Sequence, residues 1–194
     1  MTRRNRSYKR GEPFRDARLF IIACEGQKRE PAYFHTLCKR NLRVKLLILK
    51  PADGESAPRW VLRRAREYLK SFGLQRDDQL WLVLDRDRWK MEHLKEIARF
   101  CKAQNRNLAL SNPCFELWLL LHKENLPKSP PRKCNDLKRR LHTLKTTNEK
   151  LCREVRQAIA NARDRDSNPD GWMPGEMETK VYLLAQELIN LGGS

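Results

Sequence analysis

Long apolar runs are missing from this chain of 194 residues. A membrane-spanning helix needs about 20 consecutive apolar residues, and no stretch approaches that length. The basic amino terminus also lacks the apolar segment of a secretory signal. Hydrophobic residues still make up 40% of the chain, which is enough for a buried core. We therefore expect a folded, cytoplasmic protein that has no membrane partner.

Two common binding motifs are also absent. The six cysteines contain no CxxC pair, which is the spacing that zinc sites normally use. Cys24, Cys38 and Cys101 lie in apolar or helical patterns, where cysteine behaves as a small hydrophobic residue. We therefore predict buried free thiols. The chain has no Gly-x-x-x-x-Gly-Lys-Ser/Thr run, so it does not use a P-loop.

Acidic residues are scarce relative to basic ones. The chain has 41 Lys and Arg against 24 Asp and Glu, which gives a formal net charge of +17. A field of this sign attracts polyanions, and nucleic acid is the most common of them in a cell. The alternative is a basic surface that only aids solubility. We expect DNA or RNA as a partner, and the oligomeric state stays open, a homodimer included.

Short apolar runs alternate with amphipathic helical patterns in the first part of the chain. The predicted strands cover 19–24, 44–49, 80–84 and 108–110. Helical patterns follow the first three strands, and Ser56 is the predicted cap of the second helix. This order predicts an α/β fold with a four-stranded, mainly parallel sheet flanked by helices. It gives three parts: a basic flexible arm at 1–17, the α/β domain at 18–122, and a helical extension at 123–194 that packs on it.

Polar residues follow three of the predicted strands, and the carboxyl ends of parallel strands meet at one edge of a sheet. These residues are Glu25-Gly26, Asp85-Arg86-Asp87 and Ser111-Asn112. In an extended segment the side chains of Asp85 and Asp87 point to the same side, so they repel each other unless a cation lies between them. Mg²⁺ suits carboxylate oxygens. A lone Asp-x-Asp is often a solvated loop, but Glu25 after another strand favours a metal site formed by Glu25, Asp85 and Asp87.

These motifs resemble those of the Toprim domain of topoisomerases, primases and overcoming-lysogenization-type nucleases. More narrowly, the chain resembles the RloB-like family, small proteins associated with bacterial anti-phage defence. The matching stretches are 22–26, Glu30 with Tyr33-Phe34, 81–87 and 111–122, with a weaker match at 179–183. The Ser-Asn-Pro…Phe-Glu-x-Trp…His run at 111–122 is the specific element. Arg29 stands where the family usually has threonine.

The resemblance implies a Toprim-like or Rossmann-like domain and a nuclease that hydrolyses phosphodiester bonds with Mg²⁺ or Mn²⁺. It implies that Asp85 and Asp87 hold the metal and that Glu25 is either a third ligand or a general acid/base at the scissile phosphate. It also implies that Glu30 and Glu116 are further catalytic candidates, for a second metal or for orienting the first. It also implies an effector of a bacterial anti-phage or abortive-infection system, with an ATPase partner of the AAA or ABC type. The alternative is a non-catalytic nucleic-acid-binding subunit that recruits or regulates another enzyme.

Basic and polar side chains near this edge are the predicted contacts to nucleic acid. The candidates are Lys28, Arg29, Arg59, Arg63, Arg86, Arg88, Asn112 and His122. Asn112 could hold a phosphate or act as a turn residue before Pro113. His122 could bind a phosphate or have a structural role at the end of its helix. Trp89 could stack on a base or pack at the rim of the core.

Overall fold

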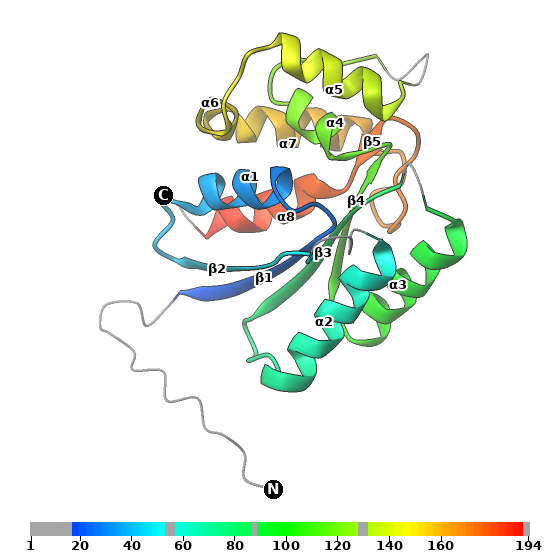
Figure 1. Cartoon of the computed structure of the whole chain (residues 1–194). Coiled ribbons are helices and arrows are strands. Elements are labelled where there is room, and N and C mark those ends of the chain that lie inside the picture. Colours follow the sequence, from blue (N-terminus) through cyan, green and yellow to red (C-terminus); the bar gives the residue numbers. More distant parts are fainter. Residues whose placement is uncertain (1–16, 53–56, 87–88, 128–131, 192–194) are drawn as a thin grey trace, which may run out of the picture.

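The computed structural model describes residues 17–52, 57–86, 89–127 and 132–191. Its centre is a sheet with the strand order β2-β1-β3-β4-β5 (Figure 1). The strands are β1 (Arg18–Cys24), β2 (Val44–Leu49), β3 (Gln79–Asp85), β4 (Asn107–Asn112) and β5 (Glu178–Thr179). The first four are parallel, and β5 runs antiparallel to β4. The predicted α/β class and its four parallel strands are confirmed, and a fifth, short strand is added.

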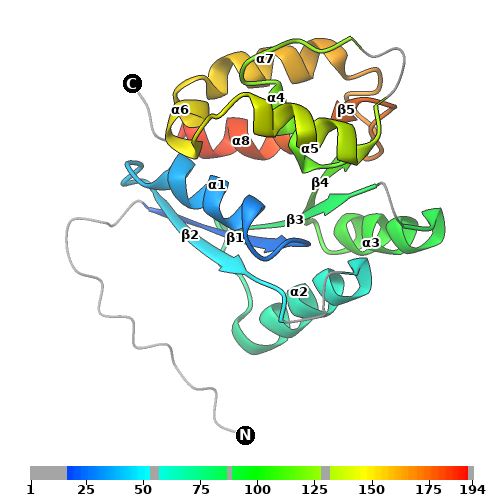
Figure 2. The same cartoon turned by 45° about the horizontal axis from the view of Figure 1, so that its top comes forward.

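Helices cover both faces of the sheet (Figures 1 and 2). On one face lie α2 (Pro58–Phe72) and α3 (Met91–Ala103). On the other face lie α1 (Arg29–Cys38), α4 (Phe115–Leu120), α5 (Cys134–Thr143), α6 (Asn148–Arg153), α7 (Val155–Arg165) and α8 (Val181–Asn190). None of the helices described in the structure is long and apolar enough to cross a membrane.

Each face of the sheet has its own apolar cluster, because successive side chains of a strand point to opposite faces. In β1, Ile21 and Ala23 pack with the cluster under α2 and α3. Phe20 and Ile22 pack with the larger cluster on the opposite face. A strand that is buried on both sides needs apolar residues at every position, which explains the continuous apolar run in the sequence.

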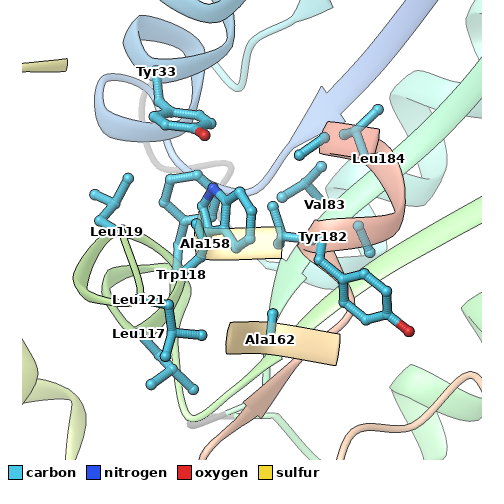
Figure 3. Packing of buried hydrophobic residues seen from close by; sticks show 14 of the residues in the cluster. Tyr33, Val83, Leu117, Trp118, Leu119, Leu121, Ala158, Ala162, Tyr182 and Leu184 are labelled. Carbon is cyan, nitrogen blue, oxygen red and sulfur yellow. The ribbon is translucent and has the colours of Figure 1, made fainter. Parts of the chain in front are cut away.

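The larger cluster surrounds Trp118 of α4, which is fully buried (Figure 3). Around it lie Tyr33 from α1, Val83 from β3, Ala158 from α7 and Leu184 from α8. The segment after residue 122 therefore shares a core with the sheet. This segment also supplies β5, which pairs with β4.

One pair of cysteines differs from the prediction of free thiols. Cys114 and Cys134 form a disulfide, with their Cα atoms 5.8 Å apart. The prediction was wrong for this pair because the fold brings the start of α4 against the start of α5, and local sequence patterns do not reveal such a contact. Cys24, Cys38 and Cys101 are buried free thiols, as predicted. The predicted cap Ser56 and the arm up to residue 16 lie outside the described residues.

Candidate active site

Glu25 and Asp85 lie beside each other at the carboxyl edge of the sheet. The chain passes from β1 outward to β2 and then returns to β3 on the other side of β1, so the strand order reverses between β1 and β3. Ligand sites of open α/β sheets form at such a switch point. Glu25 directly follows β1, and Asp85 is the last residue of β3. The backbone N–H of Asp85 donates to Glu25 Oε2 at 3.1 Å. We call this pair the acidic edge.

The Glu25 carboxylate is held in a fixed orientation. Its side chain is largely buried, with 5% of the residue exposed. Trp89 Nε1 donates to Glu25 Oε1 at 3.0 Å, so both carboxylate oxygens accept a hydrogen bond. Charge-assisted hydrogen bonds of this kind offset the loss of solvation of a buried carboxylate. Trp89 therefore orients Glu25, a role that the two alternatives drawn from the sequence did not include.

Asp85 is tied to the motif at 111–122. The backbone N–H of Phe115, the first residue of α4, donates to Asp85 Oδ1 at 2.8 Å. The preceding residue, Cys114, makes no side-chain cap. The first amides of a helix have no partner within it, and Asp85 supplies one. The N–H of Arg86 donates to the carbonyls of Ser111 (2.9 Å) and Pro113 (3.2 Å). The Ser-Asn-Pro segment thus fixes the end of β3 through its backbone.

Asp87 and Arg88 lie outside the described residues. The pairing of Asp85 with Asp87 and the contact of Arg88 with nucleic acid therefore stay predictions.

A second acidic group lies at the starts of α1 and α4. Glu30 is 7% exposed and Glu116 is 6% exposed. Burial raises the pKa of Glu30, the nearby charge of Glu116 raises that pKa further, and a hydrogen bond from the Gly26 N–H (3.1 Å) acts in the opposite direction. A Cβ at Gly26 would lie 2.3 Å from Glu30 Oε2, so the close approach of this carboxylate requires glycine.

Arg29 forms an ion pair with Glu116. Its Nη1 lies 3.1 Å from Glu116 Oε1, and the Arg29 side chain is still 47% exposed. The residue that departs from the usual threonine therefore forms an ion pair between α1 and α4. Arg29 can contact a ligand only from the exposed side of this pair.

A model of the family described as RloB-like protein matches residues 20–188. The chain belongs to the RloB-like family. The match extends from β1 to α8, so the RloB-like family region includes the C-terminal helices and β5 as well as the parallel strands. No curated protein and no solved structure shows a significant match to the chain.

His122 of the RloB-like motif is buried, with 1% of the residue exposed. Its Nε2 lies 2.9 Å from Tyr33 Oη, and its Nδ1 lies 3.0 Å from the carbonyl oxygen of Trp118. Burial lowers the pKa of His122 to about 4, so the ring is neutral at pH 7. A neutral, enclosed ring cannot reach a phosphate. The structure thus corrects the predicted nucleic-acid contact of His122 in favour of the structural alternative.

Four of the other predicted nucleic-acid contacts are exposed at the surface. Lys28 and Arg29 are exposed at the start of α1. Arg59 and Arg63 are exposed on α2, and their guanidinium carbons lie 5.1 and 4.2 Å from the ring centre of Trp60. Arg63 also lies 3.5 Å from Glu67 in an ion pair.

Asn112 is the last residue of β4 and directly precedes Pro113. Its peptide bond to Pro113 is cis, and its Nδ2 donates to the carbonyl oxygen of Pro174 at 3.4 Å. It also lines a pocket together with Arg86. Asn112 is therefore a turn residue with a half-buried side chain, and its contact with a phosphate stays a prediction.

Arg64 was not selected from the sequence, although it lies close to the acidic edge. Its Nη2 donates to the carbonyl oxygen of Cys24 at 2.8 Å, so α2 is tied to the residue just before Glu25. In the sequence Arg64 lies between Arg63 and Arg66, which are both exposed. The sequence pattern of α2 does not distinguish Arg64 from these two residues.

One group of potential metal ligands clusters tightly among the described residues. It consists of Cys114, Glu116 and Cys134, whose ligand atoms lie within 4.8 Å of one another. Both sulfurs are joined in the disulfide, so they are not thiolate ligands in this structure. The acidic edge offers only oxygen atoms, which suits a hard cation such as Mg²⁺ or Mn²⁺.

Proposed function

We propose that the chain is a metal-dependent nuclease that hydrolyses phosphodiester bonds in DNA or RNA at the acidic edge. The observation that carries the proposal is the position of Glu25 and Asp85 at the switch point of the sheet, joined through the N–H of Asp85. Hydrogen bonds from Trp89 and from the N–H of Phe115 fix the directions of their carboxylates. Preorganised ligands of this kind favour a metal in one defined position.

In this proposal Glu25 and Asp85, with Asp87, hold Mg²⁺ or Mn²⁺. A carboxylate has about four lone-pair sites, so the hydrogen bonds that it accepts do not prevent it from binding a cation. The bound ion would supply polarisation of a phosphoryl oxygen and a lowered pKa of a water molecule. Trp89 and the start of α4 keep the two carboxylates oriented. Glu25 could also exchange a proton at the scissile phosphate in place of binding the metal.

Glu30 is the second candidate for proton transfer. Its raised pKa means that it keeps a proton to higher pH than an exposed glutamate does. Glu116 lies near it and is charge-paired with Arg29, so Glu116 serves in this proposal to position α1 against α4. A protein that only binds nucleic acid gains nothing from carboxylates beside its phosphate site, which favours the nuclease over the recruiting subunit.

The biological role that we propose follows from the family. RloB-like proteins are associated with anti-phage defence, and we propose an effector of such a system with an ATPase partner of the AAA or ABC type. The ATPase would restrain or activate the nuclease, since the chain itself lacks a P-loop.

The test is cleavage of DNA and RNA pools by the purified protein, with Mg²⁺ or Mn²⁺ and with chelator. We expect metal-dependent cleavage that Asp85→Asn abolishes, because asparagine can still accept from Phe115 N–H but has lost the charge. Glu92→Gln, at an exposed acid of α3, is the matched control and should cleave normally. If neither pool is cut, alone or with the neighbouring ATPase, the recruiting-subunit alternative takes the place of the nuclease.

A further inference from the structure

A pocket of about 690 Å³ is lined in part by Arg86, the residue that follows Asp85 of the acidic edge. Its walls come from Arg86 after β3, Asn112 at the end of β4, the start of α5, and the segment just before β5. The two predicted nucleic-acid contacts Arg86 and Asn112 form one side. The opposite side comes from the start of α5 and the two residues before it.

The pocket is strongly basic. Among the described residues that line it, four are cationic, namely Arg86, Arg132, Lys133 and Lys138, and one, Glu176, is a carboxylate, which gives these residues a formal net charge of +3. Like charges that converge repel each other, and a bound anion relieves this repulsion. The lining therefore favours an anionic ligand.

The lysines and arginines of α5 and of its N-cap residue, Lys133, divide into two groups. Arg139 pairs with Asp136, and Arg140 pairs with Glu124 at 2.8 Å. Lys133 and Lys138 face the pocket, and within the described part of the chain neither forms an ion pair. The arginines thus have carboxylate partners, whereas the pocket lysines keep their charge for a ligand.

The pocket is linked directly to the acidic edge. Arg86 follows Asp85 in the chain, and its N–H is bound to the carbonyls of Ser111 and Pro113. Cys134, at the start of α5, also lines the pocket and forms the disulfide with Cys114. Cys114 immediately precedes α4, and the first N–H of α4 donates to Asp85. The disulfide therefore joins the start of α5, which lines the pocket, to the helix that positions the Asp85 carboxylate.

We propose that this pocket binds the sugar-phosphate backbone of the nucleic-acid strand next to the phosphate that is cut at the acidic edge. The inference rests on the proposed nuclease function and extends it to the path of the substrate. The volume falls within the range of roughly 300–1,000 Å³ that is typical of ligand sites, so the pocket can hold more than a single phosphate ion. Arg86 lies between the two sites and contacts the phosphate that joins them.

The chemistry of the lining favours a strand over a free nucleotide. None of the described residues that line the pocket is aromatic, so it offers no ring on which a base could stack. Lysine and arginine bind phosphate without regard to base identity. The strand is therefore held by its backbone, and binding at this pocket should not depend on sequence.

The test uses the double variant Lys133→Ala/Lys138→Ala in the full chain. Both lysines are exposed, and neither caps α5 through its side chain, so the fold should persist; thermal unfolding checks this. The matched control is Lys95→Ala/Lys102→Ala on α3, with the same loss of charge at exposed positions on the other face of the sheet. All proteins also carry Asp85→Asn, and fluorescence anisotropy with labelled DNA and RNA oligonucleotides is measured in chelator over a range of salt concentrations.

We expect the pocket variant to bind more weakly and to lower the slope of log affinity against log salt by about 1.5–2, the loss of two phosphate contacts. The control should keep the slope of the parent. Equal affinity and slope in the pocket variant and the parent would overturn the proposal, even if the protein cleaves nucleic acid. Displacement of the oligonucleotide by micromolar AMP or ADP, lost in the pocket variant, would also overturn it in favour of a free nucleotide. Absence of cleavage with the expected binding result would refute the nuclease function alone.

Discussion

Replacement of Asp85 by asparagine and by alanine should separate its two roles. The carboxylate accepts from the N–H of Phe115 at 2.8 Å and also belongs to the acidic edge. Asparagine keeps an acceptor oxygen, whereas alanine leaves the first amide of α4 without it. Both changes remove the same charge next to Glu25, so they relieve the same repulsion. The difference in stability between the two variants therefore isolates the hydrogen bond.

The magnitude follows from the loss of a helix cap in a half-buried position. Such a loss costs about 1–2 kcal/mol, which for a chain of this size lowers Tm by about 2–8 °C. We expect Asp85→Ala to melt lower than Asp85→Asn by this amount in metal-free buffer, and both to lose cleavage. Asp77→Ala, at an exposed turn, should melt like the parent.

Thermal unfolding followed by circular dichroism, with a cleavage assay on the same samples, provides the measurement. Equal Tm values for Asp85→Asn and Asp85→Ala would refute the reasoning that Asp85 anchors α4. Full cleavage by Asp85→Asn would show that its charge is not needed, and the assignment of the acidic edge would then be wrong.

Three further predictions concern other residues. His122 has a pKa of about 4 in the fold and 6.5 when unperturbed, so the unfolded state binds more protons between these two pH values. The free energy of unfolding should therefore fall by up to about 3 kcal/mol as the pH decreases from 6.5 to 4. Denaturant titrations should show this fall in the parent protein and a smaller one in His122→Gln. Lys180→Met should destabilise the protein by about 3–5 kcal/mol in the same titrations, because it leaves the fully buried Asp166 carboxylate without its cation; a loss below 1 kcal/mol would contradict this. Trp89→Phe should weaken the apparent affinity for Mg²⁺ or Mn²⁺ by about 10–100-fold, because Glu25 loses an orienting donor; calorimetric titration with each metal measures it, and an unchanged affinity would count against the role of Trp89.

The parallel strands and the acidic edge could be predicted because local sequence contains their signals. A strand that is covered on both faces is apolar at every position, and it ends where polar residues begin. Glu25 and Asp85 are the first polar residues after such runs, so parallel topology alone brings them to one edge. The prediction that Glu25 and Asp85 lie close together therefore did not depend on the helices.

Other features depend on contacts between distant segments. β5 has two residues, which is too short for an alternating pattern. The partner of Cys114 is set by the packing of α5 on α4, and the indole of Trp89 reaches Glu25 only through tertiary structure. His122 carries no sign in the sequence that both of its ring nitrogens have buried partners. The pocket lysines of α5 cannot be distinguished from its paired arginines by spacing alone.

The late position of β5 in the chain affects when the sheet can be completed as the protein folds during its synthesis. The ribosome produces β1 to β4 first, and the open edge of β4 then has neither β5 nor α8 beside it. An unpaired strand edge is prone to pair with other chains. The core around Trp118 also stays incomplete until Leu184 and its neighbours on α8 leave the exit tunnel. The open edge of β4 and the cluster around Trp118 are therefore both completed by the same segment, which carries β5 and α8.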